Sequence, residues 1–278
     1  MARPHASGSI RALMSAVTEF RNFWQRRMQI PVNGAGLVLD IGSGDKPHWR
    51  ADVLLDWLPG KDSAAQRSGY ESARVTRPLF HGDAADMPFA DQVFDYVICS
   101  HLLEHVVDPA GVLDEMMRVA KAGYIEVPEA ASAKIVDFPT HLWWVRSIDG
   151  VLDFEPKQAR AFDPEIETYL RRSGLEQPIE HLLNSRFEHR VISMRWERTI
   201  AYNVRGPVDQ RMLDQAAEAS VVHGGKSALV ATVLTGAAAT IDQRRHHRDV
   251  TFNQIVKPEL RVEHDHQLTA QIYRVAES

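Results

Sequence analysis

The sequence contains almost no cysteine. The 278 residues include a single cysteine, Cys99, so no intrachain disulfide can form. Cys99 lies in the mostly apolar run 94–99, where a buried thiol is the expected state. A chain without disulfides fits a reducing compartment, and we expect a cytoplasmic location.

Long apolar runs and an excess of positive charge are also lacking. The least polar stretch, 227–240, is rich in Ala and Thr and falls short of the roughly 20 apolar residues of a membrane span, so we interpret it as a packed helix. Lys and Arg together number 32 against 37 acidic residues, a net charge of −5. This balance argues against a protein whose main task is to bind nucleic acid.

Residues 1–30 form a separate segment. They contain five arginines and one acid, Glu19, and apolar residues recur at helical spacing between Ile10 and Met28. This pattern predicts an amphipathic helix, and packing on the domain is the favoured interpretation. Because the apolar stripe includes Phe20 and Trp24, contact with a membrane stays open as an alternative.

Residues 31–205 show the rhythm of an α/β domain with a parallel sheet. Short β-branched runs alternate with turns and helical segments, which predicts strands over 37–41, 52–57, 78–81, 94–100 and 123–127. Residues 109–120 predict a helix that begins with a proline in its first turn.

The pattern changes after Pro128, where we predict an acceptor-side insertion at 129–160. It contains a hairpin over 141–156 that turns at Asp149-Gly150, and a helix is expected over 162–172. Residues 187–204 predict one or two antiparallel strands that close the sheet. Residues 206–278 form an α+β extension with a polar helix, an Ala-rich helix and strand-like runs over 251–256 and 268–275.

Acids and glycines cluster where the first three predicted strands end. Asp40 lies at the end of the first strand, and Gly42 and Gly44 occupy the following turn. Asp56 ends the second strand, where a carboxylate can accept hydrogen bonds from both hydroxyls of a ribose, and Asp83 follows the third. Because ligands of open α/β sheets bind at the carboxyl ends of the strands, these residues predict a nucleotide-like site.

Several motifs in order resemble one known family. They occupy 39–44, 82–84, 87–89, 94–97 and 100–106, and together they resemble the methyltransferase type 11 branch of the class I S-adenosylmethionine-dependent methyltransferases. The resemblance implies a Rossmann-like sheet with helices on both faces, and S-adenosyl-L-methionine as the cofactor.

The resemblance also implies a role for each residue of the cofactor site. Gly42 and Gly44 flank the methionine part, Asp40 supports its amino group and Asp56 holds the ribose. Asp83, followed by Ala84, reads the adenine amino group, and Ser100 and His101 line the methionine end of the pocket.

One feature departs from the family pattern. Only residues 45–51 separate the glycine turn from the second strand, and Pro47 lies where a helix interior would run. We therefore expect the first helix to be shortened to a turn or replaced. Lys46, His48 or Arg50 would then supply the positive charge that a helix N-terminus usually provides to the ligand's carboxylate.

Two other functions compete with methyl transfer. In an NAD-dependent Rossmann oxidoreductase, Gly-x-Gly-x-x-Gly would need a third glycine where this chain has Pro47, and its ribose acid lies about 20 residues on rather than the 14 that separate Gly42 from Asp56. The other alternative is a methyltransferase-like binding module without catalysis. The complete set of cofactor residues argues against it.

The acceptor is expected to bind in 126–156, where the chain leaves the minimal fold. His141, Trp143 and Trp144 predict an acceptor pocket in which tryptophan rings stack on flat faces. A small polar acceptor, such as a saccharide or glycan-precursor hydroxyl, is the favoured class. His141 is the candidate general base, Glu126 the competing one and His101 the third catalytic candidate. The remaining histidine pairs, at 246–247 and 264–266, match no closed zinc spacing, so no metal site is predicted.

Overall fold

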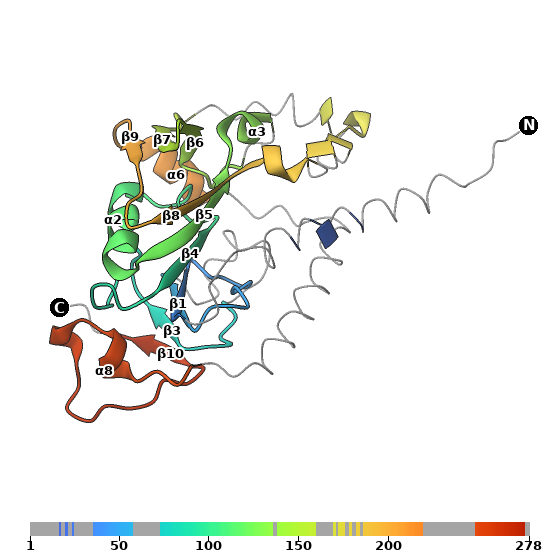
Figure 1. Ribbon diagram of the computed structural model, residues 1–278. Helices are drawn as coiled ribbons and strands as arrows, with labels where there is room; N and C mark the ends of the chain where they lie inside the picture. The colour runs from blue at the N-terminus through green and yellow to red at the C-terminus, as the bar shows by residue number, and fades with distance from the viewer. Residues whose placement is uncertain are drawn as a thin grey trace, which may run out of the picture.

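The computed structural model describes the main body of the chain (Figure 1). The described residues are 36–57, 73–135, 138–159, 186–218 and 248–275, with short stretches at 17, 20–21, 24, 169–170, 172–175, 178–179 and 182–183. The predicted helix at 227–240 and most of the one at 162–172 lie outside them.

A seven-stranded sheet forms the centre of the described fold. Its order is β10-β3-β2-β1-β4-β5-β8, and all neighbours are parallel except β5 and β8. The strands are β1 (Val38–Ile41), β2 (Val53–Asp56), β3 (Leu79–His81), β4 (Tyr96–Ser100), β5 (Ala122–Pro128), β8 (Val191–Glu197) and β10 (Ile272–Arg274). This arrangement confirms the predicted Rossmann-like sheet. The direction of the order reverses between β1 and β4, the point where such sheets bind ligands.

The five predicted parallel strands are confirmed, with bounds shifted by up to two residues. Their residues are buried almost continuously, as expected for strands that are covered on both faces. The predicted helix is α2 (Pro109–Val119), where Asp108 caps the N-terminus by accepting a 2.9 Å hydrogen bond from the Gly111 N–H. Val112, Leu113 and Met116 pack this helix into the core.

The expected loss of the first helix is also confirmed. Between β1 and β2 the described chain contains only turns and bends. The buried Asp40 carboxylate accepts the His48 N–H at 2.7 Å, and the Gly44 carbonyl accepts the Arg74 N–H at 2.9 Å. These contacts hold the short connection in place without a helix.

A second, three-stranded sheet contains the predicted hairpin. Strands β6 (Trp143–Ile148) and β7 (Val151–Pro156) are antiparallel and turn at Asp149 and Gly150, whose φ angles are 51° and 81°. Strand β9 (Tyr202–Val204) pairs with β7 in parallel. Of the one or two strands predicted over 187–204, only β8 closes the main sheet. The chain turns at Arg198, with φ 67°, and β9 then joins the hairpin. Helices α3 (Ala130–Ile135) and α6 (Gln210–Glu218) lie near this sheet in Figure 1.

The C-terminal segment returns to the main sheet. The strand predicted within 268–275 is confirmed as β10, which pairs with β3 at the sheet edge (Figure 1). The strand predicted over 251–256 is wrong, because this segment forms the short helix α8 (Phe252–Ile255). Its sequence, Thr251-x-x-Gln254, is a capping-box pattern, and the Gln254 side chain accepts the Thr251 N–H at 3.4 Å. Two 3₁₀ turns, η3 (Phe187–His189) and η4 (Pro258–Leu260), complete the described elements.

Few residues of the N-terminal segment are described. Val17, Phe20 and Trp24 have exposed fractions of 61%, 51% and 46%, so these three side chains do not show the favoured packing on the domain. The rest of the predicted helix lies outside the described residues. Among the described helices, none is both long and apolar enough to cross a membrane.

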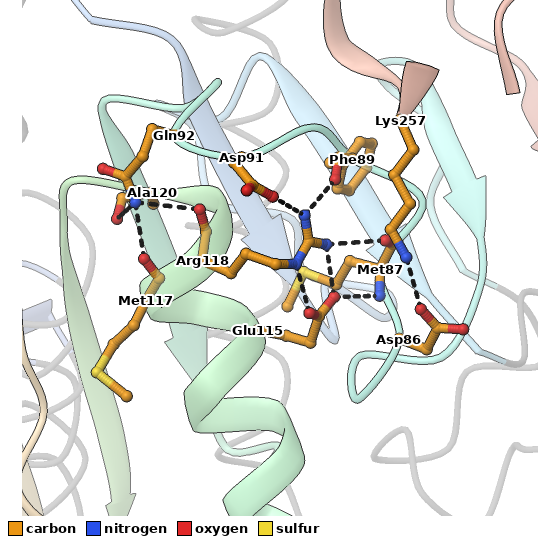
Figure 2. Close-up of polar contacts among 10 residues, drawn as sticks. All are labelled: Asp86, Met87, Phe89, Asp91, Gln92, Glu115, Met117, Arg118, Ala120 and Lys257. Carbon is orange, nitrogen blue, oxygen red and sulfur yellow. Dashed lines mark hydrogen bonds and ion pairs between the residues drawn. The ribbon is translucent and has the colours of Figure 1, made fainter. Parts of the chain in front are cut away.

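Arg118 of α2 links this helix to the loop after β3 through hydrogen bonds (Figure 2). Its guanidinium binds both carboxylate oxygens of Glu115, at 2.5 and 2.7 Å, and donates to the carbonyl oxygens of Met87 and Phe89. Glu115 in turn accepts the Met87 N–H at 2.6 Å. The hydrogen bonds that Arg118 donates to Glu115 and Asp91 raise the pKa of Arg118 further, so the arginine stays charged. The same loop follows Asp83, and Arg118 therefore helps to position the chain beyond the end of β3.

Replacing Arg118 with methionine should lower the free energy of unfolding by about 3 kcal/mol. The variant keeps the apolar stem but loses several charge-assisted hydrogen bonds, each contributing about 1.5–3 kcal/mol, with losses that do not simply add. Urea denaturation measures the change. The matched control is Lys121→Met, which removes an exposed ion pair with Asp95 and should cost no more than about 1 kcal/mol. Similar losses in both variants would contradict the role of Arg118.

Candidate active site

The turn after β1 has the backbone that its glycines predict. Gly42 and Gly44 have φ angles of +66° and +52°, a region that glycine enters without steric cost. A Cβ atom on Gly42 would lie 2.9 Å from the Leu102 side chain, so any larger residue would collide with the loop after β4. Because the two glycines have no side chains, a ligand at the carboxyl end of β1 can approach the backbone of this turn closely.

The predicted ribose acid lies directly against this turn. The Asp56 carboxylate accepts the Gly44 N–H at 2.9 Å, and the Gly82 N–H lies 3.3 Å from the Asp56 carbonyl oxygen. The ends of β1, β2 and β3 are thus connected through Asp56. Beyond β3, the Asp83 carboxylate is exposed and accepts the Ala85 N–H at 2.8 Å, while Ala84 is buried.

Asp40 and Ser43 add two buried polar groups below the turn. Asp40 is 4% exposed and binds the backbone of the short crossover. The Ser43 hydroxyl is buried and has no hydrogen-bond partner among the described residues. A free buried hydroxyl between two left-handed glycines fits a polar ligand that approaches the turn. The residues present therefore fit the amino-acid end of S-adenosylmethionine.

Trp57 is a site candidate that the sequence reasoning missed. It directly follows Asp56, is 49% exposed, and its ring lies 5.9 Å from that of His81. An exposed aromatic ring beside a ribose-binding acid can stack on a flat base. An aromatic residue immediately after a strand-end acid was the available signal.

A histidine and two buried glutamates meet where β4 and β5 end. His101 adopts φ +55°, a left-handed conformation that is uncommon for a residue with a side chain. Its Nδ1 lies 3.1 Å from Glu104 Oε1, and its Nε2 lies 3.0 Å from Glu126 Oε1. One third of the His101 side chain is exposed, whereas both carboxylates are 1% exposed. His101 is therefore the member of this cluster that solvent can reach.

The surrounding hydroxyls hold Glu126 in position. Ser100 donates to Glu126 Oε1 at 3.2 Å, and Tyr124 donates to Glu126 Oε2 at 2.9 Å. Burial raises the pKa of Glu104, but the hydrogen bond from His101 and the charge interactions with His101, His105 and His141 together outweigh burial and lower the pKa to about 2. Glu104 is thus a buried carboxylate anion at neutral pH.

The hairpin residues occupy a different environment from the one predicted. Trp143 and Trp144 are 2% and 5% exposed. Trp143 donates from its indole nitrogen to the Val106 carbonyl at 2.8 Å, and Trp144 packs on Ala130 and Ala133. These rings are buried packing residues, so they offer no open face on which an acceptor could stack.

His141 is buried as well. Burial lowers its pKa to about 3, and its ring lies 4.8 Å from the His105 ring. A group with so low a pKa is neutral at physiological pH and a weak proton acceptor. Of the three catalytic candidates, the structure brings His101 and Glu126 into direct contact, while His141 contacts their neighbours.

The strand order and the residues at the ends of β1, β2 and β3 define a class I methyltransferase domain. Residues 55–125 match the family model described as methyltransferase domain. The match runs from the end of β2 into β5 and includes Asp56, Asp83 and His101. Members of this class use S-adenosyl-L-methionine as the methyl donor.

Curated relatives match part of the chain. A demethylmenaquinone methyltransferase from Roseiflexus sp. (strain RS-1) is 33% identical over 153 residues, covering 50% of this chain and 60% of the relative. Another, from Clavibacter sepedonicus, is 51% identical over 71 residues, covering 26% and 28%. The chain thus spans less than two thirds of these relatives. An arsenic(III) S-adenosylmethionine methyltransferase structure from Chlamydomonas reinhardtii is 21% identical, with TM-score 0.26, over 36% of this chain and 41% of that one.

Replacing Asp56 with alanine should weaken S-adenosylmethionine binding roughly tenfold to a hundredfold. The loss of hydrogen bonds to a charged group costs about 1.5–3 kcal/mol. Calorimetric titration measures the affinity. Asp52→Ala is the matched control, because Asp52 lies just before β2 and also accepts one backbone N–H, that of Val38 at 3.0 Å. Equal affinities in the two variants would place the ribose elsewhere.

Burial of neutral His141 predicts an acid-sensitive fold. An unfolded histidine takes up a proton as the pH falls below about 6.5, whereas folded His141 does so only near pH 3. This contribution to stability is complete above pH 6.5 and is lost as the pH falls towards 3. From pH 7 to 5, His141 should therefore cost the protein up to about 2 kcal/mol of unfolding free energy.

Urea denaturation at pH 7 and pH 5, with a chelator present, tests this expectation. His141→Gln should lose less stability between the two pH values than the native chain does. His189→Gln is the control, because His189 is exposed. If the native chain and both variants responded equally to pH, His141 would not be responsible.

Proposed function

We propose that this protein transfers a methyl group from S-adenosylmethionine to a hydroxyl of a small polar acceptor. The contact between Asp56 and Gly44 supports this most directly, because it brings the acid at the end of β2 and the glycine turn after β1 together beside the point where the strand order reverses between β1 and β4. A cytoplasmic location belongs to the same proposal, since Cys99 is a free, buried thiol.

The cofactor residues have distinct tasks in this proposal. Gly42 and Gly44 let the backbone approach the methionine part, and Asp40 supports the ligand's amino group through the turn that it stabilises. Asp56 binds the ribose hydroxyls. Asp83, beside Ala84, reads the adenine amino group, and Trp57 covers a face of the base. Ser100 lines the methionine end, next to the loop that packs on Gly42.

The pair His101 and Glu126 is the proposed proton acceptor. When bound, S-adenosylmethionine supplies a methyl group whose bond to the sulfonium sulfur breaks as the bond to the acceptor oxygen forms. In neutral His101 the Nδ1–H faces Glu104, and the hydroxyl proton passes to the pair, where it is shared between His101 Nε2 and Glu126 Oε1, 3.0 Å apart. His141 is kept as a positioning residue, because its low pKa makes it a poor base.

The polar groups beside the glycine turn favour a hydroxylated acceptor. A saccharide or glycan-precursor hydroxyl suits a polar cluster of Ser100, His101 and Glu126, which can satisfy several hydroxyls. The buried tryptophans no longer support sugar stacking. The names of the relatives favour demethylmenaquinone as a second candidate.

Mass spectrometry of reactions with S-adenosylmethionine tests the function. The purified protein is incubated with a panel of hydroxylated sugars and, separately, with demethylmenaquinone, and the products are examined for one added methyl group. Methylated sugar supports the proposal as stated, whereas methylated demethylmenaquinone alone replaces the acceptor. Calorimetry without an acceptor separates these results from a binding module, which would bind the cofactor and methylate nothing. Absence of cofactor binding would refute the function.

Glu126→Gln should lower turnover by about a hundredfold or more, the range expected for losing general-base catalysis, with cofactor affinity nearly unchanged. Turnover is measured with the acceptor that the panel identifies, and affinity by calorimetry. The control is Glu129→Gln, three residues along the chain, where Glu129 accepts the Ala131 and Ser132 N–H groups and glutamine can do the same. Native turnover in Glu126→Gln would exclude Glu126 from the proton transfer.

A further inference from the structure

Three side chains that can bind metals converge beside the site. Glu104 and His105 belong to the loop after β4, and His141 precedes β6 in the insertion. Each offers one ligand atom, and these atoms all lie within 4.8 Å of one another. They are the only such group of histidine, cysteine and acidic side chains among the described residues.

Two of these side chains are buried with an unsatisfied atom. Glu104 is 1% exposed, and its Oε2 has no hydrogen-bond partner among the described residues. His141 is 6% exposed, and its Nδ1 also has none. An unpaired buried polar atom costs about 1–3 kcal/mol, and more when the group is charged. A ligand that accepts electron pairs from both atoms would remove this cost.

The third side chain is already oriented. His105 Nδ1 lies 3.1 Å from the carbonyl oxygen of Thr140, so this nitrogen carries the hydrogen and Nε2 keeps its lone pair. Metal-binding histidines commonly donate their other ring N–H to a carbonyl or carboxylate in this way. Thr140 adjoins His141, so the same short segment orients one histidine and supplies the other.

The chemistry of the three groups selects a class of ion. Two neutral imidazoles and one carboxylate suit a first-row transition metal, and Zn²⁺ in particular, which keeps its fourth position for water. Ca²⁺ and Mg²⁺ prefer oxygen ligands throughout. With metal–ligand bonds of about 2.0–2.2 Å, tetrahedral ligand atoms lie about 3.3–3.5 Å apart, so the separations here need to close by no more than about 1.5 Å.

We propose that Glu104, His105 and His141 form a binding site for a divalent transition metal, with Zn²⁺ as the preferred ion. The ion would connect the loop that covers Gly42 to the insertion that carries the hairpin. The proposal goes beyond methyl transfer and does not depend on it. It also differs from the histidine pairs considered in the sequence, because its ligands come from distant parts of the chain.

Calorimetry and elemental analysis of the chelator-stripped full chain test the site with Zn²⁺ alone. We expect one Zn²⁺ per chain. His141→Ala and Glu104→Gln should each weaken Zn²⁺ binding by at least about a hundredfold, since even partners outside the ligand set contribute tenfold to a hundredfold. The control His264→Ala/His266→Ala, which removes two exposed histidines, should keep native affinity. No bound Zn²⁺, or unchanged binding in both cluster variants, would overturn the proposal.

Titration of the native protein with Co²⁺ supplies a test that needs no variant. Co²⁺ bound by two nitrogens and a carboxylate in tetrahedral geometry should produce ligand-field absorption bands that Zn²⁺ abolishes. Co²⁺ that keeps the spectrum of the hydrated ion would count against the site, even if the variants failed to fold. Neither readout involves S-adenosylmethionine, so failure of the metal site and failure of the proposed function are distinguishable.

Discussion

The hydrogen bond between Gly44 and Asp56 is the interaction on which the cofactor site depends. In an ordinary crossover of this fold, a helix after β1 fixes the glycine turn and points its N-terminus at the ligand. Here the crossover is a few turns long, and that support is absent. Asp56 instead fixes the turn from the next strand, and Asp40 binds the crossover backbone from within the core. The two carboxylates thereby hold the glycine turn and the crossover in place, as a helix usually does.

This substitution changes the electrostatics of the crevice. A helix N-terminus provides partial positive charge, whereas Asp40 and Asp56 bring negative charge to the same edge. The basic side chains of the crossover, Lys46 and Arg50, then become the nearest sources of positive charge along the chain. A sulfonium ligand is cationic, so the negative charge of Asp40 and Asp56 does not repel its sulfonium group. An anionic ligand would bind this edge less favourably than the N-terminus of a helix.

The loop after β4 connects the glycine turn to the insertion that carries the hairpin. Leu102 packs on Gly42, His101 bridges the two buried glutamates, and Glu104 and His105 meet His141 of the insertion. Contacts of both ring nitrogens with buried carboxylates support the left-handed conformation of His101. Trp143 donates to the Val106 carbonyl of this loop, so its contribution is to support the shape of the loop rather than to contact an acceptor.

Local patterns in the sequence determined the parts of the molecule that depend on near neighbours. Buried β-branched runs, Pro109 at a helix start, Asp149-Gly150 in a hairpin turn and Pro47 in a crossover too short for a helix each act through their own backbone or adjacent residues. The acids and glycines at the ends of β1 to β3 were predictable for the same reason, because parallel strands bring their carboxyl ends to one edge.

Only the tertiary structure decided what depends on distant contacts. Thr251 to Val256 is β-branched in part, yet it forms a helix whose Phe252 ring stacks on Phe80 of the sheet at 6.0 Å. Trp143 and Trp144 had the composition of a binding surface, but burial against the loop and α3 turned them into packing residues. The meeting of Glu104 with His141 leaves no trace in local spacing, because the free energy of a buried polar cluster depends on which chain segments exclude water from it.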